Sequence, residues 1–149
     1  MDAAAHLAGF IERYSPAIAT DANAMLARLR ARVPGATLLV YDNYNALAIG
    51  FAGGDKAGDI VLSLALYPRW ITLFFMRGTD LADPQGLLAG TGTTVRQIRL
   101  DGPETLDDLR VAALIAAALA LAQPPIDPAA PGGVVIKSIS AKQRPRRPA

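Results

Sequence analysis

The chain of 149 residues contains no cysteine and a single histidine, His6. Without cysteine it has no disulfide, no thiolate nucleophile and no cysteine metal site. Zinc in proteins takes nitrogen or sulfur ligands, and one histidine cannot supply a site. A serine nucleophile would have only His6 as its base, and this residue falls in a short helix at the start of the chain. These absences disfavour hydrolase and zinc chemistry.

Paired carboxylates and phosphate-binding glycine motifs are also missing. Glutamate occurs only at Glu12 and Glu104, and most aspartates fall at expected loops and helix caps. The sequence therefore contains no carboxylate pair that would indicate acid–base catalysis. The run GTGTT at 90–94 matches neither the dinucleotide fingerprint nor the P-loop, and it leads into an expected strand. The sequence predicts a protein that is not an enzyme and that holds no cofactor.

Long hydrophobic runs are absent, although the mean hydropathy of +0.26 is high. The longest apolar run, 111–122, is mostly alanine, and it is much shorter than the roughly 20 residues that cross a bilayer core. No basic residue precedes an apolar segment at the N-terminus, so we expect no signal peptide. The sequence predicts a cytoplasmic protein without a membrane partner.

Positive charge is concentrated in the last nine residues, which contain no acid. The remaining residues carry eleven bases and thirteen acids, a formal charge of −2, so the body of the chain is not basic. A short basic end is typical of a solvated, disordered tail, which we expect at 141–149. The alternative, which the acidic body disfavours, is an electrostatic arm for nucleic acid. Its residues would be Lys142, Arg144, Arg146 and Arg147.

Hydrophobic spacing predicts helices first and strands next. Apolar residues recur at helical spacing over 7–14 and, after the helix-start signal Ser15-Pro16, over 18–33. Asp83-Pro84 and Gly90 predict a short helix inside the connection 77–94. Thr105 resembles a cap for a helix that runs to about 122, with Asp107 and Asp108 as capping charges. Strands are expected at 37–41, 46–52, 60–67, 70–76 and 95–100.

The expected order of elements describes one α+β domain at 1–123. Short connections make neighbouring strands antiparallel, and the sheet has five to six strands with the C-terminal helix packed on one of its faces. A proline-rich linker at 124–133 precedes an extra strand at 134–140 and the basic tail. The second sheet face carries large apolar side chains, so we expect a helix, a second subunit or a ligand to cover it. These side chains are Tyr67, Trp70, Phe74 and Met76.

The segments GTGTTVRQIRL at 90–100 and ETLDDLRVAALIAAALA at 104–120 resemble a known bacterial family. With PGATLLVYDNYNALAIGF before them and VVIKSISAKQRPRR after them, the chain resembles the YdhG-like domain of unknown function. The resemblance covers roughly residues 5–122. It implies the frataxin-like fold of the YdhG/YjbR/CyaY-like superfamily, an α+β sandwich. It also implies, through some relatives, an iron-chaperone activity.

Iron binding of the frataxin kind uses a ridge of exposed carboxylates on the first helix and first strand, because hard cations favour oxygen ligands. The opening helices here contain only Asp2, Glu12 and Asp21, which are well separated and lie among arginines. The residues therefore favour binding of a small ligand or protein over iron handling.

Six residues form the candidate binding site: Tyr41, Asp42, Tyr44, Asn45, Trp70 and Arg96. A hairpin turn explains Asp42 and Asn45, together with Asn43 between them, because these residue types bond their own backbone. The tyrosines combine an apolar ring with a hydroxyl group that needs a partner, as at binding surfaces. Arg96 shares a strand face with apolar residues and needs an acceptor, either a structural carboxylate at Asp42 or Asp80 or a bound anion. A homodimer that covers the second sheet face is the alternative to a ligand.

Overall fold

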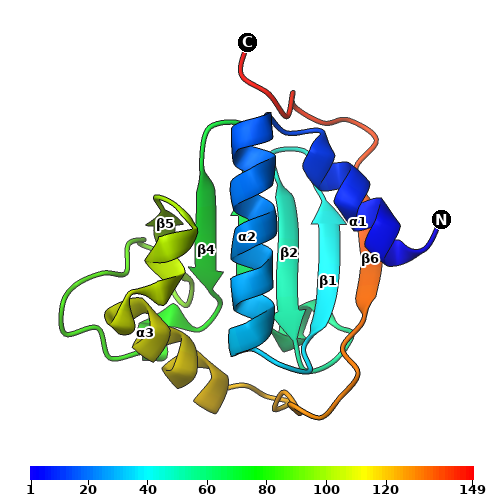
Figure 1. Ribbon diagram of the computed structural model, residues 1–149. Helices are drawn as coiled ribbons and strands as arrows, with labels where there is room; N and C mark the ends of the chain where they lie inside the picture. The colour runs from blue at the N-terminus through cyan, green and yellow to red at the C-terminus, as the bar shows by residue number, and fades with distance from the viewer.

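The computed structural model describes residues 1–149 and shows a six-stranded sheet with three helices on one of its faces (Figure 1). The helices are α1 (Ala3–Glu12), α2 (Pro16–Arg32) and α3 (Leu109–Ala120). The strands, in the spatial order β5-β4-β3-β2-β1-β6, confirm the α+β prediction. Their bounds are β1 (Thr37–Asp42), β2 (Leu47–Ala52), β3 (Ile60–Leu66), β4 (Ile71–Phe75), β5 (Arg96–Leu100) and β6 (Val134–Ile139).

The sheet is mixed because its last strand differs from the others in direction. Strands β1 to β5 pair antiparallel, whereas β6 pairs parallel with β1 at the edge of the sheet. The chain reaches that edge through residues 121–133, which contain no helix or strand. This proline-rich linker carries the chain from the end of α3 across the molecule to the β1 edge of the sheet (Figure 1).

The core lies between the sheet and the helices. Alternate residues of β3 and β4 point toward the helices and are almost fully buried, as their period of two predicts: Leu62, Leu64, Leu66, Ile71, Leu73 and Phe75. Helix α2 runs along the strands over the middle of the sheet, α1 lies on the β6 side and α3 on the β4–β5 side (Figure 1). Burial of apolar surface on this one face holds the two layers together.

Tyr14, in the turn between α1 and α2, is a buried polar link between the layers. Its hydroxyl group donates to the Leu66 carbonyl (2.9 Å) and accepts from the Leu47 amide (3.1 Å). Burial raises the pKa of Tyr14 above its usual value. The link fixes the turn against the ends of β2 and β3.

One predicted helix start is confirmed and one is wrong. The Ser15 hydroxyl accepts from the Ile18 amide, with Pro16 opening α2 as expected. The predicted cap at Thr105 is wrong, because Pro103–Asp107 form a 3₁₀ turn and α3 begins after Asp108. The Asp108 carboxylate caps that helix and bonds the Arg110 side chain, which holds its pKa at about 2.

The predicted short helix at 83–90 is also wrong. The Asp83 carboxylate accepts from the Leu87 and Leu88 amides and closes a turn, and Gly86 has a positive φ of 64° that no helix allows. The regular element in this connection is a 3₁₀ turn at Gly78–Asp80. No helix of the structure is long and apolar enough to span a membrane.

Candidate functional site

The face of the sheet opposite the three helices has no helix over it (Figure 1). Strand register aligns its side chains in two rows across β1 to β5. One row is Leu39, Gly50, Ser63, Phe74 and Gln97, and the next is Tyr41, Ala48, Ala65, Thr72 and Arg99. At Ala48, Ser63 and Ala65 the central strands β2 and β3 carry small side chains, with larger residues on the strands beside them, whereas the Ile60 side chain fills the space over Gly50. The middle of this face is therefore hollow.

The hollow is a shallow depression of about 500 Å³, which we call the open-face depression. Small side chains, including Ala48, Ser63 and Ala65, form its floor. Aromatic and thioether side chains form its walls, and the turn after β1 closes one end. The remaining lining residues are Asn43, Tyr44, Asn45, Ala46, Tyr67, Phe74, Met76 and Ser140, so no charged side chain lines it.

Two of the six predicted site residues, Tyr44 and Asn45, line this depression. Both lie in the turn between β1 and β2, and the Tyr44 side chain is 49% exposed. Tyr41 lies on the same face, but its hydroxyl group is buried, has no hydrogen-bond partner, and does not reach the depression. The prediction thus located one wall of the depression and missed its floor.

Trp70 lies beside the depression and is already engaged by other side chains. Its ring stacks on Tyr67, with centroids 5.5 Å apart, and the Arg99 guanidinium lies 4.4 Å from its centroid. In the register, Arg99 is opposite Thr72, which is almost fully buried on this face. Trp70 therefore supports the Tyr67 wall and is not itself a lining residue.

Arg96 does not belong to this site. Its guanidinium donates to the carbonyl groups of Gly92 (2.6 Å) and Val95 (2.8 Å). The predicted ion pair with Asp42 or Asp80 is wrong, because those carboxylates pair with other arginines. Arg96 instead holds the glycine-containing turn before β5, where local backbone acceptors are closer than any carboxylate.

Asp42, expected as a turn residue, is the last residue of β1 and is only 1% exposed. Its carboxylate pairs with Arg146 at 2.8 Å and with Arg13 at 3.3 Å. Arg146 is 4% exposed, and its guanidinium lies 5.8 Å from the Tyr14 ring centroid. It also donates to the carbonyl groups of Asn43 and Tyr44. A buried carboxylate is thus matched by a buried cation from the far end of the chain.

Residues 140–147, which include most of the tail expected at 141–149, are docked against the turn between β1 and β2. The Ser140 amide and the Gln143 side chain donate to the Asp42 carbonyl, both at 2.9 Å. The Arg144 amide donates to the Tyr44 carbonyl at 2.9 Å. A basic composition alone does not reveal that one arginine of this end has a buried acceptor.

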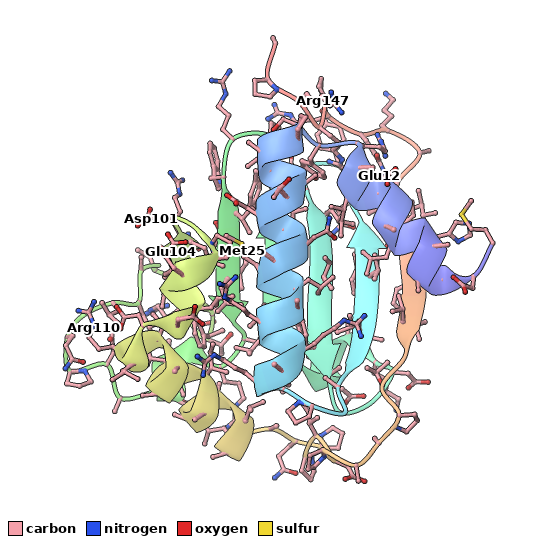
Figure 2. All side chains as sticks on the ribbon, viewed as in Figure 1. Glu12, Met25, Asp101, Glu104, Arg110 and Arg147 are labelled. Atoms are coloured by element: carbon pink, nitrogen blue, oxygen red, sulfur yellow. The ribbon has the colours of Figure 1, made fainter.

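The four basic residues of this end differ in their surroundings. Arg146 is buried, and the Arg144 guanidinium lies 5.9 Å from the Tyr44 ring centroid. Arg147 donates to the Arg13 carbonyl, where α1 meets α2. Figure 2 labels Arg147 at the top of the molecule. Lys142 is exposed. These residues therefore make contacts within the molecule as well as carrying positive charge.

The described residues do not bring together three or more His, Asp or Glu side chains in a geometry that could hold a metal ion. Comparison with family models, with curated proteins and with solved structures finds no match for this chain, so the resemblance to the YdhG-like family stays a prediction.

Proposed function

We propose that this protein is a non-enzymatic binding domain that holds a small, neutral and planar ligand in the open-face depression. The observation that carries the proposal is the floor of small residues between aromatic walls, on a sheet face with no helix over it. A volume of about 500 Å³ falls within the usual range for small-molecule sites.

The chemistry of the lining favours a ligand without net charge. Burying a charged group against apolar residues is costly unless an opposite charge compensates it, and no charged side chain lines the depression. The amide groups of Asn43 and Asn45 and the hydroxyl groups of Ser63 and Tyr44 can each donate or accept. An aromatic ring system with one polar edge matches this combination, because its face packs on the floor while its edge bonds to the rim.

The test uses indole and quinoline as neutral planar probes, with saturation-transfer NMR to detect binding to the intact protein. Ser63→Leu fills the floor on β3 and should weaken binding by about tenfold or more. Gln97→Leu introduces leucine in the same row of the sheet, on β5 and outside the depression, and should leave binding unchanged.

Three results would contradict the proposal. The first is no saturation transfer from the wild-type protein at millimolar probe. The second is equal binding by the wild type and Ser63→Leu. The third is a dimer in light scattering that Ser63→Leu dissociates, since a second copy and not a ligand would then cover this face.

A further inference from the structure

The last part of the chain, residues 134–147, contacts the rest of the molecule as a bound peptide would. We call it the C-terminal segment. Its strand β6 pairs only with β1, and Val135 and Ile139 remain exposed, at 37% and 59%. A linker with prolines at 124, 125, 128 and 131 joins it to the remainder. The segment is thus held by backbone pairing and by few buried side chains.

Arg146 is the fully buried anchor of this segment, and the pocket that receives it is built by the rest of the chain. Asp42 ends β1, and Tyr14 is fixed by its own bonds to β2 and β3. Arg13 approaches the same carboxylate from the α1–α2 turn but is half exposed, at 48%. Asp42 and Tyr14 are therefore held by elements outside the C-terminal segment, whereas the Arg13 guanidinium also donates to the Gln143 side chain of that segment at 2.7 Å.

The pocket suits an arginine better than a lysine. The guanidinium bonds the Asp42 carboxylate and two successive carbonyl groups, those of Asn43 and Tyr44, while it lies over the Tyr14 ring. A planar group with several donors can satisfy these acceptors at once, whereas a lysine ammonium is a single point charge.

We propose that the outer edge of β1 and the Asp42–Tyr14 pocket form a peptide-binding site. Its ligand is a segment that forms a strand and carries, after the strand, an arginine that enters the pocket. The chain's own C-terminal segment occupies the site, and the same segment of a second copy can replace it. Addition of an extended segment to a sheet edge, with one side chain in a pocket, is an established mode of peptide recognition. The ten residues 124–133 reach at most about 36 Å when extended, comparable to the width of a domain of this size.

Exchange of this segment would also affect the open-face depression. Ser140, which follows β6, lines the depression, and the segment bonds the carbonyl groups of the 43–46 turn that forms its end. A dimer formed by exchange therefore contains a complete depression to which both copies contribute.

The experiment mixes two full-length variants with complementary defects. Asp42→Asn damages the pocket and keeps an intact segment, whereas Arg146→Ala damages the segment and keeps an intact pocket. We expect each variant alone to be a monomer of 15.6 kDa and the mixture to form a complex of twice that mass in light scattering. Association in the mixture should be at least about 30-fold tighter than self-association of either variant.

Lys142→Ala is the matched control, since it removes one positive charge from the exposed part of the same segment. Mixed with Asp42→Asn it should form no complex, because its own anchor still fills its pocket. A second measurement tests the proposal if a variant is too unstable for the mixing experiment. A synthetic peptide of residues 133–149 should raise the melting temperature of Arg146→Ala, and a peptide with alanine in place of Arg146 should not. Absence of both the complex and this rescue would overturn the proposal.

Discussion

Replacing Arg146 by alanine tests whether the C-terminal segment stabilises the fold. The substitution leaves the Asp42 carboxylate, 1% exposed, without its nearest cation at 2.8 Å. Breaking a buried ion pair by removing one partner typically costs about 3–5 kcal/mol. Arg13 stays within 3.3 Å of the same carboxylate and compensates in part, so we expect the free energy of unfolding to fall by about 3 kcal/mol.

A loss of that size is easily measured by urea unfolding and by thermal melts followed by circular dichroism. For a chain of this length, 1 kcal/mol shifts the melting temperature by about 2–4 °C, so the expected decrease is about 6–12 °C. Lys142→Ala should change stability by less than about 0.5 kcal/mol, because Lys142 is exposed. In Asp42→Asn/Arg146→Ala the loss should be smaller than the sum of the single losses.

The reasoning would be refuted if Arg146→Ala unfolded within about 0.5 kcal/mol of the wild type. That result would mean that the basic end is solvated, as its composition indicates, and that Asp42 is satisfied by Arg13 and by water alone.

The remaining predictions concern single contacts, each measured by unfolding. Tyr14→Phe removes a hydroxyl group that bridges two buried backbone groups and should cost about 1–3 kcal/mol in urea unfolding. Gly35→Ala should destabilise by more than about 1 kcal/mol in thermal melts, because φ is 82° and a methyl group would overlap the Asp127 carbonyl. The pKa of Asp108 is lowered from 3.8 to about 2 by Arg110, so its contribution is present above pH 3.8 and is lost as the pH falls through about 2. Asp108→Asn keeps a helix cap and should flatten the pH dependence of the melting temperature between those values; an unchanged profile would contradict this assignment.

Local patterns of side chains predicted most of the fold. The alternation in β3 and β4 and the helical spacing in α2 are set by short-range geometry, so the sequence located these elements to within a residue or two. The false helix at 83–90 came from a signal that Asp83 satisfies within a single turn. The direction of β6 depends on where a long linker leads, and no local pattern encodes that path.

The candidate site was predicted only in part, because its two main features depend on pairing between distant residues. Ala48 and Ser63 are unremarkable within their own strands, and they form a floor only when the register places β2 beside β3. Asp42 and Arg146 are 104 positions apart, and each has a sufficient local explanation, as a turn residue and as part of a basic end. Because each residue is explained by its neighbours in the sequence, nothing in the sequence indicates that Asp42 and Arg146 pair with each other.

The turn at 43–46 belongs to both the open-face depression and the docking site of the C-terminal segment. Tyr44 lines the depression with its side chain, while its carbonyl accepts from the Arg144 amide and the Arg146 guanidinium. The position of one wall therefore depends on contacts made on the opposite side of the same short loop. If the ligand binds only when the wall is held in this place, docking of the segment and ligand binding favour each other by the same factor, because such coupling is reciprocal. The basic end of the chain then acts on the depression through the backbone of the turn, without placing a charge in it.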